Sequence, residues 1–216
     1  MTLKLYMHPL SSYCHKALIA FYENDIPFEN VVVDLGDPKS AGEFKALWPI
    51  GKFPVLKDET RDWMIPESTI IIEYLAQHYP GKVKLIPDDP DRARQVRMRD
   101  RFFDLYMHAH MQKGSGDRLR PEGGRDPYGV EQAKNAYRTA LDMLDGEMAD
   151  KEWAMGDDFT MADCAAAPAL CYGNRLLVPF RATHKNAAAY LDRLMARPSY
   201  ARALKEAEPY FHTLPG

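Results

Sequence analysis

The chain has 216 residues, with 28 basic against 31 acidic side chains and a formal net charge of −3. That length suits one large domain or two small ones, and either can bury a substantial core. The nearly balanced charge argues against bulk binding of nucleic acid, which requires a basic face. Three cysteines form no disulfide framework, and their odd number suits a reducing compartment.

The sequence predicts neither a membrane span nor a secretion signal. Residues 1–6 read as a strand and lack the long apolar region of a signal peptide. No apolar run approaches the roughly 20 residues that a membrane-spanning helix needs. We therefore expect a cytoplasmic protein that does not enter a membrane.

The first eighty residues alternate between strand and helix patterns. Ser40 and Glu43 have the S-x-x-E spacing of a capping box, and Pro80-Gly81 ends the last helix. The apolar run 31–33 is typical of a buried parallel strand. In chain order we predict strand 3–7, helix 13–24, strand 31–33, a helix after Ser40, strands 54–56 and 63–65, and helix 68–79.

Two stretches in this part carry groups that suit a ligand. Pro54 stands at the mouth of a strand, and a cis bond before it would turn the backbone of Phe53 outward. Ser68 precedes a helical run, so it is a candidate N-cap beside N–H groups that bind carboxylates, and Glu67 would hold an ammonium group. The pattern fits a receptor for an extended peptide. It fits equally well the start of a strand and a helix cap without a ligand.

The order of elements, with a proline before the third strand, resembles the thioredoxin fold. Ser11-Ser12-Tyr13-Cys14 stands where that fold has its C-x-x-C turn, with serine in place of the reactive cysteine. In that setting the hydroxyl of Ser11 would lie at a helix N-terminus, where the dipole favours an anion, and would shift a bound thiol towards thiolate. Cys14 is expected to be a buried apolar residue.

These motifs and the helical second half resemble the glutathione S-transferases, in particular the theta-like and bacterial serine enzymes. The resemblance extends over nearly the full length. It implies Ser11 as the thiol-activating hydroxyl, with Ser12 as its rival. It further implies the contacts to glutathione, namely Phe53 with cis Pro54 for the cysteinyl unit, Glu67 and Ser68 for the γ-glutamyl group, and Lys52 with Lys39 for the glycyl carboxylate. We expect a homodimer that directs glutathione at a small electrophile in detoxification and uses no metal.

Other functions on the same scaffold stay open. A glutathione-dependent isomerase, dehalogenase or ether-cleaving enzyme is one alternative, and a non-catalytic transferase-like binding protein is another. The zeta-type pattern Ser-Ser-Cys-Ser-Trp-Arg is not matched by Ser11-Ser12-Tyr13-Cys14-His15-Lys16, and omega-like reactions need a cysteine at position 11. A hydroxyl at position 11 together with Glu67-Ser68 favours catalysis over simple binding.

The second half of the chain has the pattern of an all-helical domain. We predict a thioredoxin-like glutathione-binding domain at 1–80, a proline-rich linker at 81–91 and an all-helical domain at 92–216. Helices are expected at 91–112 and 130–148. The segment 113–129 between them is rich in Gly, Arg and Pro, and it is either a solvated connector or a lid.

A second motif opens a later helix. Thr160 and Asp163 have the spacing of a capping box, with Asp in the place usually held by Glu or Gln. Pro168, inside the helix that follows, is expected to kink it. This motif is similar to one in the C-terminal domain of the transferases, and its role is structural.

Residues of the second half supply candidates for an electrophile pocket. Methionine and aromatic walls suit varied apolar ligands, although such residues also form cores. His108 and His110 are two positions apart on a helix and point in different directions, so they cannot share a metal. The candidates are Tyr106, Met107, Met111 and Tyr172. The arginine-rich helix 92–101 is either a solvated face, a subunit interface or a binding surface for an anionic substrate.

Overall fold

A four-stranded sheet forms the first part of the molecule. A computed structural model describes residues 2–213. The strands run in the order β2-β1-β3-β4, with β2 parallel to β1 and both β3 and β4 antiparallel to their neighbours. Their bounds are β1 (Leu3–Met7), β2 (Glu29–Val32), β3 (Val55–Asp58) and β4 (Trp63–Pro66). The predicted thioredoxin-like order of elements is confirmed.

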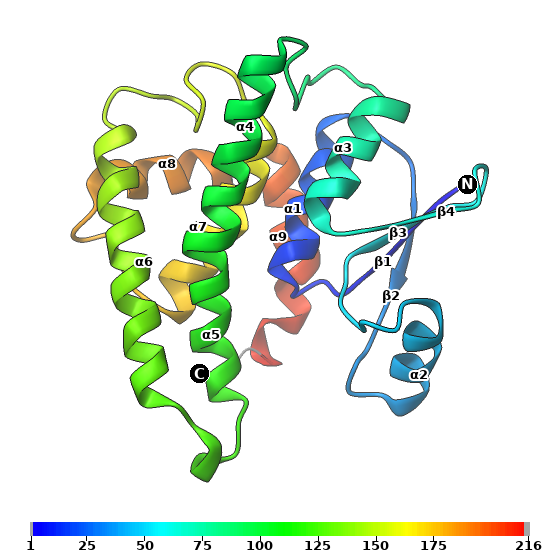
Figure 1. The fold of residues 1–216 in the computed structure, drawn as a ribbon, viewed down its shortest axis with the longest axis horizontal. Coiled ribbons are helices and arrows are strands. Elements are labelled where there is room, and N and C mark those ends of the chain that lie inside the picture. The colour runs from blue at the N-terminus through cyan, green and yellow to red at the C-terminus, as the bar shows by residue number, and fades with distance from the viewer. Residues whose placement is uncertain (1, 214–216) are drawn as a thin grey trace.

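Three helices accompany this sheet, α1 (Ser12–Glu23), α2 (Pro38–Leu47) and α3 (Ser68–His78). Helices α1 and α3 lie between the sheet and the helical part, whereas α2 lies away from the helical part (Figure 1). Leu3, Leu5 and Met7 alternate towards the main core, because successive strand residues point to opposite faces. The opposite face of the sheet packs a small cluster around Phe44 of α2.

Two predictions for this part were wrong in detail. Strand β2 is an edge strand whose residues are mostly exposed, so its apolar run is not a buried strand. Helix α2 begins at Pro38 and is capped by Asp37, whose carboxylate accepts from the amides of Lys39 at 3.3 Å and Ser40 at 3.1 Å. Proline suits the first helical position and Asp is a strong N-cap, so this pair takes precedence over the Ser40 box.

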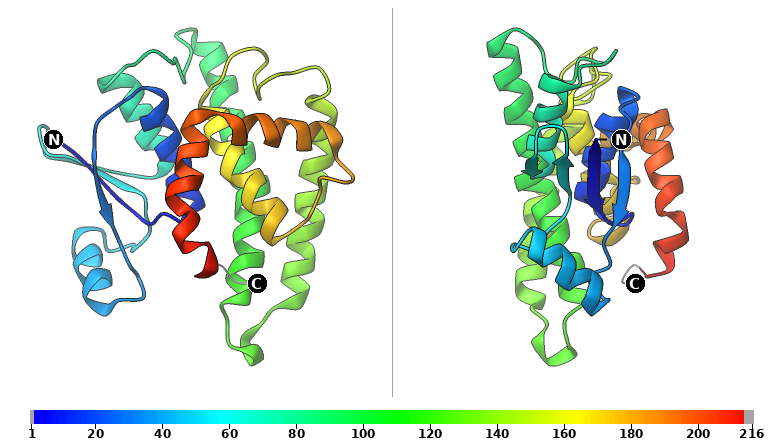
Figure 2. Two further views of the ribbon diagram at one scale, coloured as in Figure 1. Left: turned by 180° about the vertical axis from the view of Figure 1, so that it is seen from behind. Right: turned by 90° about the vertical axis from the view of Figure 1, so that its right-hand side faces the viewer.

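The second part of the molecule is all helical, as predicted. Its longest stretch is a nearly continuous rod of α4, a π-helical segment and α5 (Figure 1). Seen from behind, α9 lies beside α1, and η3 continues from it (Figure 2). The bounds are α4 (Pro90–Phe102), η1 (Phe103–His108, the π-helical segment), α5 (Ala109–Arg118), η2 (Glu122–Gly124), α6 (Pro127–Glu147), α7 (Met161–Leu176), α8 (Lys185–Ala196), α9 (Pro198–Ala207) and η3 (Glu208–Thr213).

The predicted loop 113–129 was too long, because helix covers both of its ends. Gly114 lies against α7, where an added Cβ would stand 2.4 Å from a methyl group of Leu177. The glycine therefore permits a close approach and does not end the helix. Asp117 accepts from the amide of Asp126 at 2.8 Å, and Asp126 caps α6 by accepting from Gly129 at 2.8 Å. These bonds leave a short connection.

The capping box predicted at Thr160 and Asp163 is present at the start of α7. Asp163 accepts from the amide of Thr160 at 2.8 Å, which satisfies a donor at the start of α7. Its other oxygen accepts from the amide of Ala154 at 2.8 Å and from the hydroxyl of Tyr190 at 2.6 Å. Helix α7 continues through Pro168 to Leu176. The motif thus joins three segments of the helical part.

A buried ionic cluster joins the two parts of the molecule. The ammonium group of Lys16 on α1 is fully buried and lies 2.7 Å from Asp100 and 2.8 Å from Asp104. It also donates to the hydroxyl of Thr69 on α3 at 2.7 Å. A buried charge requires such partners, since desolvation would otherwise cost several kcal/mol. The cluster therefore fixes α1 and α3 against the helical part.

Candidate functional site

The predicted glutathione-binding segments meet at one end of the sheet. Tyr6 pairs with Val55, and Val55 pairs with Pro66 across β1, β3 and β4. Because these strand pairs are antiparallel, the chain leaves β1, enters β3 and leaves β4 at the same end. The loop before α1, the residues before β3 and the start of α3 therefore lie around this end.

The two serines of the turn before α1 have different environments. Ser11 is half-buried and is the N-cap of α1, and its hydroxyl oxygen accepts from the amide of Cys14 at 3.3 Å. Ser12 is buried, and its hydroxyl oxygen lies 2.6 Å from Nε2 of His108. Of the two hydroxyls, that of Ser11 is the more accessible. Cys14 is buried, as predicted, and burial raises the pKa of its thiol to about 12.

The bond between Phe53 and Pro54 is cis, as predicted. Pro54 is buried and directly precedes β3, where a residue without an amide proton is tolerated. Among the described residues no hydrogen bond to the backbone of Phe53 is recorded. Its amide and carbonyl groups thus remain available at the end of the sheet.

Glu67 connects β4 to α3 in an unusual conformation. Its φ of 71° lies in the left-handed region, which is uncommon for a residue other than glycine and often marks a functional site. Its side chain is exposed and makes no recorded hydrogen bond or ion pair within residues 2–213. Glu67, not Ser68, takes the N-cap position, so the prediction for Ser68 as the N-cap was wrong. Ser68 is the buried first residue of α3.

Two lysines were predicted to hold the glycyl carboxylate. Lys52 is exposed immediately before Phe53, at the same end of the sheet. Lys39 is exposed in the first turn of α2. Within the described part of the chain neither ammonium group has a recorded ion pair. Lys52 lies near the other site segments because it directly precedes Phe53, whereas Lys39 lies on the separate helix α2.

The four candidates for an electrophile pocket do not come together on a surface. Met107, Met111 and Tyr172 are core residues with at most 4% of their surface exposed. Tyr106 is 57% exposed, and it lines an apolar cavity of about 550 Å³ between the long rod and α6. The helical periodicity gave the right apolar positions but could not distinguish the buried ones from those beside a ligand.

An aromatic row next to Ser11 was not predicted. His8, in the loop before Ser11, stacks on Phe53 with ring centroids 6.2 Å apart and meets Tyr210 edge-on at 5.4 Å. Burial lowers the pKa of His8. The position of His8 directly after a strand was a usable signal. Tyr210 belongs to η3, far along the chain, and no sequence spacing placed it here.

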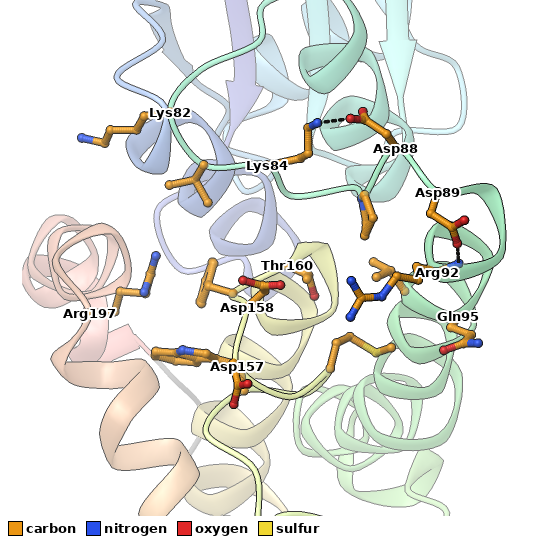
Figure 3. A pocket seen from close by; sticks show the side chains of 16 residues that line it. Lys82, Lys84, Asp88, Asp89, Arg92, Gln95, Asp157, Asp158, Thr160 and Arg197 are labelled. Carbon is orange, nitrogen blue, oxygen red and sulfur yellow. Dashed lines mark hydrogen bonds and ion pairs between the residues drawn. The ribbon is translucent and has the colours of Figure 1, made fainter.

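A second cavity lies elsewhere, at the opposite end of α1. It has a volume of about 730 Å³ and is bordered by the linker, the start of α4 and the loop before α7 (Figure 3). Glu23, the last residue of α1, receives both bonds of the Arg197 guanidinium there, each at 2.7 Å. Lys84 and Asp88 pair at its edge. This cavity is therefore separate from the Ser11 end of α1.

Among residues 2–213, no helix is long and apolar enough to cross a membrane. The same residues contain no group of three or more His, Cys, Asp or Glu side chains that could hold a metal ion.

A thioredoxin-like sheet with a serine at the start of α1, followed by a helical domain, defines the class of cytosolic-type glutathione transferase folds. Two sequence models match the chain, the glutathione S-transferase N-terminal domain over residues 5–83 and the C-terminal domain over residues 102–198. The chain belongs to the glutathione S-transferase family.

The similar proteins include both glutathione S-transferases and stringent starvation proteins. The chain is similar to glutathione S-transferase GstB of Escherichia coli K12, with 29% identity over 71% of this chain and 74% of the relative. It is also similar to a stringent starvation protein A homolog of Coxiella burnetii, with 28% identity over 98% of this chain and 96% of the relative.

Solved structures show the same fold. A glutathione S-transferase from Methylobacterium radiotolerans, in complex with glutathione sulfonate, is 29% identical with a TM-score of 0.80, covering 93% of both chains. One from Methylobacillus flagellatus with bound glutathione is 25% identical with a TM-score of 0.80, covering 93% of this chain and 98% of the other.

Proposed function

We propose that this protein is a glutathione transferase that ionises the thiol of glutathione with the hydroxyl of Ser11 and directs it at a small electrophile. The observation that carries the proposal is the half-buried hydroxyl of Ser11 at the N-terminus of α1, at the sheet end that also bears Phe53 and Glu67. The family membership and the glutathione-bound relatives support it.

Ser11 would act by stabilising the thiolate. A free thiol has a pKa near 8.5, so it is mostly protonated at neutral pH. The Ser11 hydroxyl can donate to the sulfur while its oxygen still accepts from the amide of Cys14. The dipole of α1 favours the negative charge at the same place. The thiolate then forms a C–S bond to the electrophile, whose leaving group or π electrons take up the electron pair.

The other segments would hold the peptide. Phe53 offers a backbone amide and carbonyl for antiparallel pairing with the cysteinyl unit. The exposed carboxylate of Glu67 suits the γ-glutamyl ammonium, and the first amides of α3, starting at Ser68, suit its carboxylate. Lys52, with Lys39 as a second candidate, would bind the glycyl carboxylate. Such anchoring places the thiol for attack and supplies the entropic part of the rate gain.

We place the electrophile beside the aromatic row of His8, Phe53 and Tyr210, because it adjoins Ser11. Detoxification in the cytoplasm is the setting we propose for this reaction.

We also propose a homodimer. Ile70, Met98 and Leu105 are each more than half exposed, although they are large and apolar. They lie on α3, α4 and the π-helical segment, and a bond from Arg97 to Glu73 holds α3 beside α4. Contiguous exposed apolar residues mark interaction surfaces. Light scattering that gives the mass of a monomer at micromolar concentration would contradict the dimer.

The second candidate is a glutathione-binding or interaction protein without transferase activity. The match to the stringent starvation protein A homolog over 98% of this chain favours keeping it. Such a protein needs no hydroxyl that shifts the thiol pKa, so the two candidates differ in a measurable property.

The deciding experiment is an ultraviolet titration of the thiolate of bound glutathione in the wild type, Ser11→Ala and Ser11→Thr. We expect the wild type to lower the thiol pKa of bound glutathione below that of free glutathione. In Ser11→Ala the pKa should return most of the way to the free value, whereas Ser11→Thr, which keeps a hydroxyl, should behave like the wild type. Glutathione affinity should change little. Binding without any lowering of the thiol pKa in the wild type would instead support the second candidate, and an alanine variant whose thiol pKa is as low as in the wild type would remove Ser11 from the role.

A further inference from the structure

A bond across the two parts of the molecule lies directly behind the thiol site. His108 is fully buried, and its Nε2 lies 2.6 Å from the hydroxyl oxygen of Ser12, a residue 96 positions earlier. Ser12 is the first residue of α1 and the neighbour of Ser11. Whichever atom carries the shared proton, the bond ties the first turn of α1 to the helical part.

Two further contacts strengthen this connection. The ring of Tyr13 stacks on His108 with centroids 3.8 Å apart and planes 5° from parallel. One turn further along α1, Lys16 lies 2.8 Å from Asp104, which belongs to the same segment as His108. Successive residues of α1 are thus held by one short stretch of the long rod.

That stretch is the π-helical segment η1, which ends at His108. A π-helical turn inserts an extra residue into a helix, is rare, and occurs often at functional sites. It changes the direction of the side chains that follow, so its place between α4 and α5 bears on where His108 points.

The atoms of His108 are not arranged for acid–base chemistry. Its Nδ1 is buried and has no recorded partner among the described residues, so no carboxylate orients the ring. Burial lowers the pKa of His108 to about 3, and the nearby Lys16 charge acts in the same direction. The ring stays neutral at physiological pH. Its contribution is therefore a fixed hydrogen bond.

We propose that His108 is a positioning residue for the thiol site, because its bond to Ser12 fixes the turn that carries the Ser11 hydroxyl. This inference rests on the proposed function. A displacement of about 1 Å in a positioned group can lower a rate by about 100-fold. The helical domain would then set the geometry of thiol activation, although Ser11 itself belongs to the thioredoxin-like part.

The test uses a matched pair, His108→Gln and His108→Met. The two side chains have similar length and volume, and both remove the stacked ring, but glutamine keeps a hydrogen-bonding group near the position of Nε2. We expect the thiol of bound glutathione to titrate about one pH unit higher in the methionine variant than in the glutamine variant, with about tenfold less thiolate at acidic pH. Ser12→Ala removes the same bond from the other side and should reproduce this shift.

Amide hydrogen exchange supplies a measurement without glutathione. The amides of Cys14 and His15 donate to Ser11, and we expect both to exchange faster in His108→Met than in His108→Gln. In the double variant His108→Met/Ser12→Ala, the Ser12→Ala change should cause no further increase in exchange, because the hydrogen bond to His108 is already lost.

The outcomes separate this inference from the proposed function. A wild type that lowers the thiol pKa, with equal titrations and exchange in all variants, would overturn the positioning role alone. Equal changes in the methionine and glutamine variants would assign the effect to the lost ring and overturn the hydrogen-bond account. A wild type that binds glutathione with no pKa shift would overturn the proposed function and the role of His108 in it.

Discussion

Removal of the Asp163 carboxylate should destabilise the helical domain severely. The side chain is fully buried and accepts four hydrogen bonds, two of them at 2.8 Å from the amides of Ala154 and Thr160. The other two come from the hydroxyls of Tyr190 at 2.6 Å and Thr160 at 3.1 Å. Asp163→Ala leaves four buried donor groups, from three residues, without their acceptor.

The expected loss follows from the cost of those groups. A buried donor without a partner costs about 1–3 kcal/mol, and relaxation recovers part of the sum, so we expect about 3–6 kcal/mol. That is a large share of the roughly 5–15 kcal/mol that stabilises a typical domain. Urea unfolding followed by circular dichroism would measure the free energy of unfolding of Asp163→Ala against that of the wild type.

Tyr190→Phe provides the matched control. In the wild-type background it removes one bond to a carboxylate and should cost about 1.5–3 kcal/mol. In the Asp163→Ala background that acceptor is already absent, so the same change should cost almost nothing. An unfolding free energy of Asp163→Ala within about 1 kcal/mol of the wild type, or a full cost of Tyr190→Phe in both backgrounds, would refute the reasoning.

Three further predictions concern stability and binding. Burial lowers the pKa of His15 to about 4, so unfolding takes up a proton at this residue as the pH falls from about 6.5 to 4. The contribution of His15 to stability therefore falls by about 3 kcal/mol over that range, and His15→Gln should reduce the slope of stability against pH by that amount; an unaltered slope would contradict this prediction. Gly173→Ala should cost about 1–3 kcal/mol in urea unfolding, because its Cβ would stand 1.9 Å from the hydroxyl of the buried Tyr137, and unchanged stability would show that α7 can shift. Glu67→Gln should weaken glutathione binding about tenfold by calorimetry through the lost charge pairing, with Lys57→Gln on the same sheet as a control; equal affinities would remove Glu67 from the site.

Sequence reasoning succeeded where the determinants are local. The alternation in Leu3–Met7 and the aspartate box at Asp163 each depend on a few neighbouring residues. It failed where contacts far along the chain decide. Residues 113–129 were predicted as a loop because they are rich in Gly, Arg and Pro, yet α5 continues past Gly114 to Arg118, and the missing side chain of Gly114 makes room for Leu177.

The candidate site shows the same division. Glu67 and Ser68 were identified as a pair at the start of a helix, and α3 does begin at Ser68, but the N-cap is Glu67 and not Ser68, because the left-handed φ of Glu67 is a property of the folded connection. Met107 and Met111 were predicted to line an electrophile pocket, but both are buried in the core. Which side of the rod they face depends on the π-helical segment, and no sequence pattern predicts such a segment.

The proposed choice of Ser11 over Ser12 depends on a contact with the helical domain. Adjacent hydroxyls in one turn are equivalent as sequence, and both suit a helix N-terminus. In the fold, Ser12 is buried against His108, whereas Ser11 stays half-exposed at the end of the sheet. On the proposals above, the bond to His108 would occupy the Ser12 hydroxyl and also hold the backbone of its neighbour Ser11 in place. Exchange of the helical domain between relatives would therefore alter thiol activation even if every residue from 1 to 80 were kept.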